Sequence, residues 1–152
     1  ADKMTDANWD LTQNLNVAAP FFLAKAMVPG MRAKGWGRIV NFASLQSRRA
    51  FANGISYGAS KGAVEQMTRA MAEAWSRDGI TANAIAPGFF RTELTAPVFS
   101  DPKLSAQNAA QTCIGRNGEV YDMDGPMMFF CSDASNYVTG QTLFVDGGYT
   151  AK

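Results

Sequence analysis

Residues 39–86 are IVNFASLQSRRAFANGISYGASKGAVEQMTRAMAEAWSRDGITANAIA, and this stretch decides the fold class. Residues 39–43 form a short apolar run with β-branched members, which is typical of a buried strand. Residues 56–75 then carry apolar side chains at helical spacing, and residues 80–86 form a second apolar run that Pro87 and Gly88 end. A strand, a helix and a second strand in this order predict parallel strands with a helix packed on the sheet.

The flanking sequence extends this pattern in both directions. Towards the N-terminus we expect a helix over 10–31, preceded by an N-cap at Thr5 or Asp6. Towards the C-terminus we expect a short helix near 103–111, another over 120–131 despite an internal Gly-Pro pair, and a last strand over 142–145. The first of these helices is predicted to bury one apolar stripe, made of Leu11, Leu15, Ala18, Ala19, Phe22, Ala26 and Met27.

Three strands are too few for a complete sheet of this kind, and no strand precedes the first helix. We therefore expect residues 1–152 to be one partial domain, the C-terminal half of a larger α/β fold. Upstream strands, or the edge of another chain, are expected to complete the sheet.

The composition excludes several classes of protein. The chain has 152 residues, 47% hydrophobic and 18% charged, with a formal net charge of +1 and no histidine. The near-zero charge gives no electrostatic surface for nucleic acid, and the absence of histidine removes His-based triads and His metal sites. The two cysteines have no metal-ligand spacing, and no apolar stretch is long enough to span a bilayer. With no secretion signal either, we expect a cytoplasmic protein.

The densest chemical signal is YGASK, residues 57–61. Tyr57 and Lys61 are four residues apart, so they share one face of a helix. A phenol is a poor acid or base near neutral pH, and a nearby ammonium favours the phenolate. The pair therefore indicates an acid/base site. The alternative is a packed tyrosine beside a solvated lysine.

Three other positions are candidates by their location. Ser44 follows the first strand, at the end where open α/β sheets bind ligands, and its hydroxyl would reach a substrate oxygen. Pro87-Gly88-Phe89-Phe90-Arg91-Thr92 follows the second strand in the same way. Asn16 lies four residues before Pro20, which has no N–H to pair with the Asn16 carbonyl, so that carbonyl is free to hold a water.

In this order, these residues resemble the short-chain dehydrogenase/reductase family. Asn16 lies seven residues after Trp9, as the helix asparagine of that family does, and Ser44 lies thirteen residues before Tyr57. Tyr57 and Lys61 match the YxxxK pair. The segments matching the NxxxPG motif and two later motifs of the family are Asn83–Gly88, Gly115–Glu119 and Tyr137–Gly140.

The resemblance implies a Rossmann-like doubly wound sheet, a nicotinamide cofactor and hydride transfer to or from a carbonyl or alcohol carbon. Tyr57 would be the acid/base, Lys61 would tune it and contact the ribose, and Ser44 would stabilise the reacting oxygen. Asn16 would hold a relay water. Pro87, Gly88, Phe90 and Thr92 would meet the carboxamide and phosphate end of the cofactor.

The family's glycine-rich phosphate loop and the residue that selects NAD or NADP are absent from these 152 residues. In the family both lie upstream of Asn16, so the cofactor is expected to be either NAD or NADP. The family's helix pairs also imply a homodimer or homotetramer.

Within the family, residues 43–47 and 87–102 resemble gluconate 5-dehydrogenases and related keto-sugar reductases. Gln46 and Arg91 are the expected substrate contacts, with Arg48 and Arg49 also available for a carboxylate. The alternative is that the arginines are solvated loop residues. Two other functions stay open: a 3-oxoacyl-thioester reductase, and a non-enzymatic fragment that acts as an assembly module.

Overall fold

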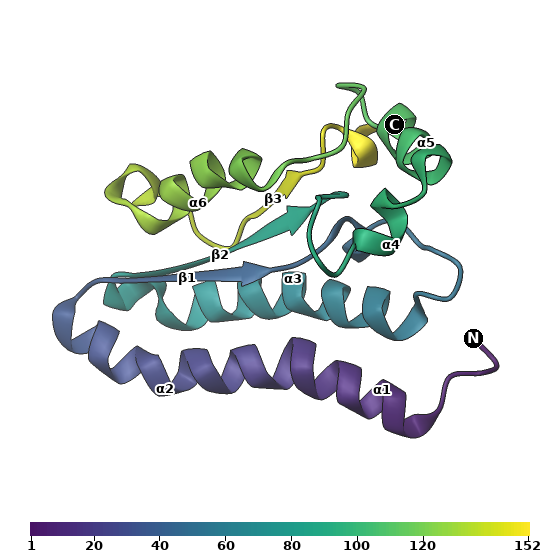
Figure 1. Ribbon diagram of the computed structural model, residues 1–152. Coiled ribbons are helices and arrows are strands. Elements are labelled where there is room, and N and C mark those ends of the chain that lie inside the picture. The colour runs from purple at the N-terminus through teal and green to yellow at the C-terminus, as the bar shows by residue number, and fades with distance from the viewer.

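The computed structural model describes residues 1–152, and its centre is a parallel sheet of three strands (Figure 1). They are β1 (Gly37–Phe42), β2 (Ile80–Pro87) and β3 (Thr142–Val145), in the order β1-β2-β3. The predicted parallel α/β class is therefore confirmed. Strand β2 is central and β1 is an edge strand, paired only with β2.

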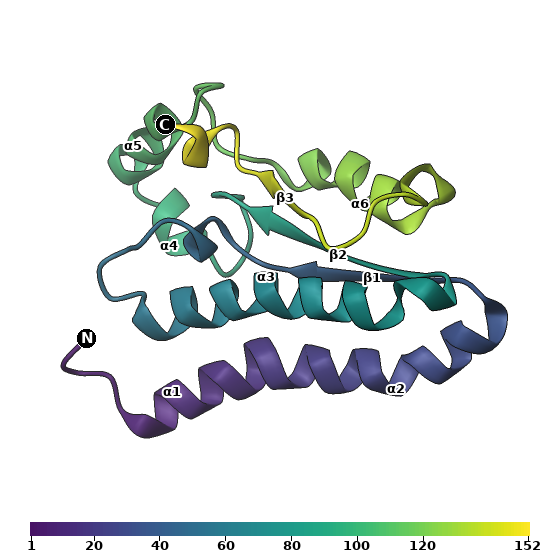
Figure 2. The same cartoon turned by 180° about the vertical axis from the view of Figure 1, so that it is seen from behind.

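Helices cover both faces of the sheet (Figures 1 and 2). On one face, α3 (Ile55–Trp75) lies against the strands, and α1 (Asp6–Gln13) and α2 (Ala19–Lys34) run alongside it. Helix α6 (Asp124–Cys131) lies on the opposite face. The short helices α4 (Ala96–Phe99) and α5 (Pro102–Gln111) lie beyond the carboxyl ends of the strands.

The core lies between the sheet and helices α2 and α3. Strand β2 is almost fully buried because both of its neighbours are strands and both of its faces are covered; Ile80 and Ile85 have no exposed surface. One cluster of buried side chains joins α2, α3 and the first two strands: Ala24, Val28, Ile39, Met71, Ala72, Ile80 and Ala82.

The first helix differs from its prediction in length and in the face it buries. It continues past Pro29 to Lys34, where Gly35 adopts a left-handed conformation and ends it. The predicted buried stripe is wrong. Leu11, Leu15 and Phe22 are 66%, 67% and 61% exposed, and α2 instead buries Ala24 and Val28. Ala24 and Val28 are four residues apart, so they share one face of the helix, and that face packs in the core cluster with Ile39.

The C-terminal elements agree with the sequence pattern. Strand β3 begins and ends at the predicted residues. The expected helix over 120–131 starts as a 3₁₀ turn, Val120–Met123, and becomes α-helical at Asp124. Pro126 lies in the first turn of α6, where its missing N–H leaves no helical hydrogen bond unmade. Helix α4 was not predicted. No helix of the structure is both long and apolar enough to cross a membrane.

Candidate active site

The candidate residues gather where β1 and β2 end. The two strands are parallel and in register from Gly37–Ile80 to Phe42–Ile85, so the chain leaves both at the same edge of the sheet. The Ala43 N–H still donates to the Ile85 carbonyl, at 2.8 Å, and Ser44 is the first residue beyond this bond. The sheet therefore holds the start of the Ser44 loop firmly.

Ser44 is buried, and its hydroxyl has one fixed partner. The backbone of Ser44 is extended, and its Oγ accepts a hydrogen bond from the Gln46 N–H at 3.1 Å. A hydroxyl has one proton and two lone pairs. Since Oγ is an acceptor in this bond, its proton is free to be donated to another oxygen.

Tyr57 and Lys61 lie together on the first turns of α3, as their spacing predicts. The Lys61 Nζ is 5.6 Å from the centroid of the Tyr57 ring and donates to the Phe42 carbonyl at 2.7 Å. That carbonyl belongs to the last residue of β1. Burial lowers the pKa of the Lys61 ammonium below its ordinary value, because desolvation disfavours the charged form. Tyr57 keeps 36% of its surface exposed.

Asn16 lies in a turn of π-helix, Asn14–Ala18, between α1 and α2. In this turn the Ala19 N–H donates to the Asn14 carbonyl, five residues earlier. The widened turn lies where Pro20 leaves the Asn16 carbonyl without its helical donor, as the sequence predicts. The Asn16 side chain donates to the Ser60 Oγ at 3.0 Å, and Ser60 donates to the Tyr57 carbonyl at 2.7 Å.

Ser60 is thus a link between Asn16 and Tyr57 that the sequence analysis missed. It has no exposed surface, although it lies inside the YGASK segment. Its position three residues after Tyr57 was the available signal, because residues three apart neighbour each other on a helix.

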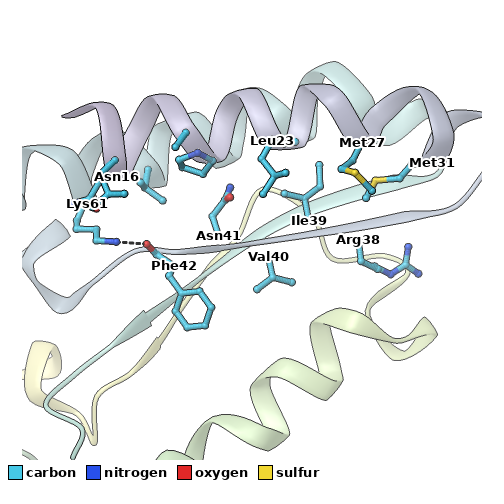
Figure 3. A pocket seen from close by; sticks show the side chains of 15 residues that line it. Asn16, Leu23, Met27, Met31, Arg38, Ile39, Val40, Asn41, Phe42 and Lys61 are labelled. Carbon is cyan, nitrogen blue, oxygen red and sulfur yellow. Dashed lines mark hydrogen bonds between the residues drawn. The ribbon is translucent and has the colours of Figure 1, made fainter. Parts of the chain in front are cut away.

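Asn16 and Lys61 both line a cavity of about 610 Å³ between α2 and the edge of β1 (Figure 3). Most of its lining is apolar and includes Leu23, Met27 and Ile39. The Lys61 ammonium and the Asn16 side chain come together at one end of this cavity, and the Arg38 side chain lies at the other end (Figure 3).

The segment after β2 is held by backbone contacts. The Gly88 N–H donates to the Val145 carbonyl at 2.9 Å, and a Cβ at Gly88 would lie 2.8 Å from the Cα of Asp146, so only glycine fits. Phe90 is buried and forms a parallel bridge with Gly118. The Thr92 hydroxyl is 3.0 Å from the Thr95 hydroxyl. The segment is therefore a fixed turn beside the Ser44 loop.

The predicted substrate residues are less free than the sequence suggests. Arg48 pairs with Glu65, at 3.6 Å, and its guanidinium lies 4.4 Å from the centroid of the Phe144 ring. Arg91 pairs with Glu119 at 3.4 Å.

Two further substrate candidates lie near the same loop. Arg49 donates to the Lys152 carbonyl at 3.1 Å. Gln46 has a buried Oε1 with no hydrogen-bond partner and lines a cavity of about 670 Å³ beside the N-terminus of α3. Of the predicted substrate residues, Gln46 alone presents a buried polar atom with no partner in the chain.

Known proteins are similar to this chain over almost its whole length. A family model described as "Enoyl-(Acyl carrier protein) reductase" matches residues 1–150. The chain is 39% identical over 149 residues to a gluconate 5-dehydrogenase of Gluconobacter oxydans, covering 98% of this chain and 58% of that protein. It is 42% identical over 149 residues to a galactitol 2-dehydrogenase of Cereibacter sphaeroides, with 95% and 58% covered.

A solved structure is similar to this chain over almost its whole length. The crystal structure of a gluconate 5-dehydrogenase from Burkholderia cenocepacia, in complex with NADP and tartrate, superposes with a TM-score of 0.96 at 40% identity, covering 99% of this chain and 59% of that one. The chain thus spans about three-fifths of the length of these relatives. The family model matches residues 1–150, and the ordered motifs and the parallel sheet agree with it. The chain therefore belongs to the short-chain dehydrogenase/reductase family.

Proposed function

We propose that this chain is the catalytic portion of an oxidoreductase that transfers a hydride between NAD or NADP and a carbonyl or secondary alcohol. The observation that carries the proposal is the placement of Lys61 beside Tyr57 on α3, at the strand end where Ser44 offers a free proton. A packed tyrosine with a solvated lysine would not explain why the Lys61 ammonium is partly desolvated and turned towards the end of β1.

The residues of this chain fit the nicotinamide end of the cofactor. The Lys61 ammonium has three donors and uses one on the Phe42 carbonyl, which leaves two for the ribose hydroxyls. The turn from Pro87 to Thr92, with Gly88 and Phe90 held by backbone contacts, lies beside the same strand end and would meet the carboxamide and phosphate groups. When bound, the cofactor supplies the hydride donor or acceptor.

In this proposal, side chains of this chain carry out the proton transfer. Tyr57 Oη would give a proton to the substrate oxygen or take one from it, and the Lys61 ammonium would stabilise the phenolate form. Ser44 would donate its free proton to the same oxygen and hold it in place. Asn16, whose side chain is fixed by Ser60, would hold the relay water with its carbonyl at the Lys61 end of the cavity.

We propose a sugar acid or keto-sugar, such as gluconate or 5-ketogluconate, as the substrate. The Gluconobacter and Burkholderia relatives are gluconate 5-dehydrogenases, and the tartrate in the Burkholderia complex is itself a hydroxy acid. Gln46 and the exposed guanidinium of Arg91 are the polar groups available near the site. The second candidate is a 3-oxoacyl-thioester reductase, which is favoured by the acyl-carrier-protein substrate in the description of the family model.

The proposal includes residues outside this sequence and a second copy. The glycine-rich loop that binds the cofactor phosphates in this family is absent from the 152 residues, so another portion of protein would supply it. The exposed apolar side chains of α1 and α2 favour a homodimer or homotetramer. Both cysteines are free, which agrees with the proposed cytoplasmic location.

The test is to complete the fold and assay it. Residues 1–152 would be fused behind the N-terminal portion of the Gluconobacter enzyme that the match leaves uncovered. The purified fusion is expected to form reduced cofactor with gluconate and either NADP or NAD. The unfused chain, lacking the phosphate loop, is expected to turn over far more slowly. Turnover with acetoacetyl thioester but not with gluconate would favour the second candidate. Turnover with neither would contradict the proposal.

A further inference from the structure

The hydroxyl of Ser47 lies between two residues of the proposed site without belonging to it. Ser47 ends the single 3₁₀ turn Leu45–Ser47 that follows Ser44. Its Oγ donates to the Lys61 carbonyl at 3.0 Å and accepts from the Ser44 N–H at 3.4 Å. One side chain therefore joins the backbone of Ser44, on the loop, to the backbone of Lys61, on the helix.

Few other polar contacts join the Ser44 loop to α3. A hydroxyl can make both contacts at once, because one uses its proton and the other a lone pair. A second side-chain tie between this loop and α3 is the ion pair of Arg48 with Glu65, which is longer, at 3.6 Å, and has an Arg48 side chain that is 56% exposed. Glu65 has a side chain that is 8% exposed and also pairs with Arg69, at 3.3 Å, so the Arg48 contact is the longer of two on the same oxygen. The Lys61 ammonium holds α3 to the Phe42 carbonyl, but that carbonyl belongs to β1 and not to the loop that carries Ser47. The Ser47 bond is shorter and partly buried.

The Ser47 link fixes the distance between the Ser44 loop and helix α3, which carry different residues of the proposed site. Ser44 is carried by β1 and its loop, whereas Tyr57 and Lys61 are carried by α3. The reacting oxygen must lie within hydrogen-bond reach of groups from both elements. Rotation or displacement of the loop against the helix would separate them while leaving each element folded.

We propose that Ser47 is a positioning residue, which sets the Ser44 hydroxyl relative to Tyr57 and Lys61 through its two hydrogen bonds. The proposal rests on the proposed function for its effect on turnover, but the contact itself is independent of that function.

The principal test is Ser47→Ala in the fused enzyme. A loosened loop would misplace Ser44, and small misplacements of catalytic groups cost up to about 100-fold. We expect kcat to fall between about 10-fold and 100-fold, while KM for the cofactor changes little, because Lys61 keeps its side-chain contacts. Ser47→Thr retains a hydroxyl and is expected to restore most of the lost kcat.

Ser135→Ala is the matched control. Ser135 has no exposed surface, and its Oγ donates to the Phe130 and Ser132 carbonyls, both at 3.2 Å, in the loop that follows α6. This variant also loses a buried hydroxyl, so it is expected to lower the melting temperature without changing kcat. If kcat falls as far in Ser135→Ala as in Ser47→Ala, general destabilisation explains the loss and the proposal is overturned.

Amide hydrogen exchange gives a readout that needs no activity. The Ser44 N–H has Oγ of Ser47 as its acceptor, so it is expected to exchange several-fold faster in Ser47→Ala. The neighbouring Ala43 N–H, bonded to the Ile85 carbonyl, is expected to keep its protection. Unchanged exchange at Ser44 overturns the proposal.

The two measurements also separate this inference from the proposed function. An inactive wild-type fusion would contradict the proposed function, and exchange at Ser44 would still decide whether Ser47 holds the loop. An active wild-type fusion with an equally active Ser47→Ala variant would overturn the positioning role alone.

Discussion

The Tyr57–Lys61 side of α3 and the outer face of α1 and α2 differ in how many contacts their side chains make within the chain. Around α3, the side chains of Asn16, Ser60 and Lys61 each have a hydrogen-bond partner within the chain. On the outer face, Leu11 and Phe22 are 66% and 61% exposed and do not line the cavity between α2 and β1. The first region is specified by contacts among these 152 residues, whereas the apolar side chains of the second are exposed to solvent.

The edge of β1 resembles the outer face of α1 and α2, because it also exposes apolar side chains. Phe42 is 50% exposed although it ends a strand of the central sheet, and the apolar cavity beside that strand opens along the same edge. Exposed apolar area beside an unpaired strand edge is a site of association in soluble proteins. The comparison therefore predicts that substitutions in the two regions have different consequences: loss of chemistry in one and loss of assembly in the other.

The largest expected effect is that of Tyr57→Phe on chemistry. The substitution removes one hydroxyl and keeps the ring, so the packing of α3 is retained. If Tyr57 is the acid/base, kcat of the fused enzyme falls by at least about 10² to 10⁴-fold. Cofactor affinity is expected to change little, since Lys61 is the main ribose contact in the proposed function.

Tyr121→Phe is the control for that experiment, because Tyr121 is 67% exposed and lies in the 3₁₀ turn before α6, which carries no residue of the candidate site. It is expected to keep full turnover. Near-normal kcat in Tyr57→Phe would remove the catalytic assignment.

The sequence predicts the first region better than the second, and the reason is physical. Tyr57, Lys61 and Ser44 follow from local rules, namely helical spacing and the ends of parallel strands. The kink at Asn16 follows from the missing N–H of Pro20, because that effect is also local. The exposed stripe of Leu11 and Leu15 could not be predicted, since periodicity identifies an apolar face but not what covers it.

The sequence also could not predict ion pairs between residues that lie far apart along the chain. The sequence offers Arg48 and Arg91 as free cations, and the structure pairs them with Glu65 and Glu119. Those partners lie 17 and 28 residues away along the chain, so only the tertiary fold brings them together.

The next effect contrasts two apolar side chains. Ile85 is fully buried in β2, and Ile85→Ala is expected to lower the free energy of unfolding of the fused enzyme by about 2–5 kcal/mol through lost burial and a cavity. Leu11→Asp adds a charge on the outer face, where Leu11 is 66% exposed. It is expected to dissociate the proposed dimer or tetramer while the secondary structure is retained.

Urea denaturation measures the first variant and sedimentation velocity the second. Ile85→Ala should keep the sedimentation coefficient of the wild type. If Leu11→Asp also sediments as the wild type does, the outer face is not the surface through which copies associate.

The smallest effect tests an exposed contact outside both regions. Arg116 donates two hydrogen bonds to the Asp122 carboxylate, at 2.7 and 2.8 Å, and the Glu119 N–H donates a third at 2.8 Å. These contacts lower the pKa of Asp122 from 3.8 to about 2, with the Arg116 hydrogen bonds as the main cause.

Because the pKa of Asp122 is lower in the folded state, its carboxylate stabilises the fold above its unfolded pKa and loses that contribution as pH falls towards about 2. Asp122→Asn should therefore melt slightly below the wild type at neutral pH, and the two melting curves should converge as the solution is acidified through this range. The difference should be small because the pair is exposed and screened by solvent. A gap that stays constant down to pH 2 would mean that shape, and not charge, is what Asp122 contributes to the turn before α6.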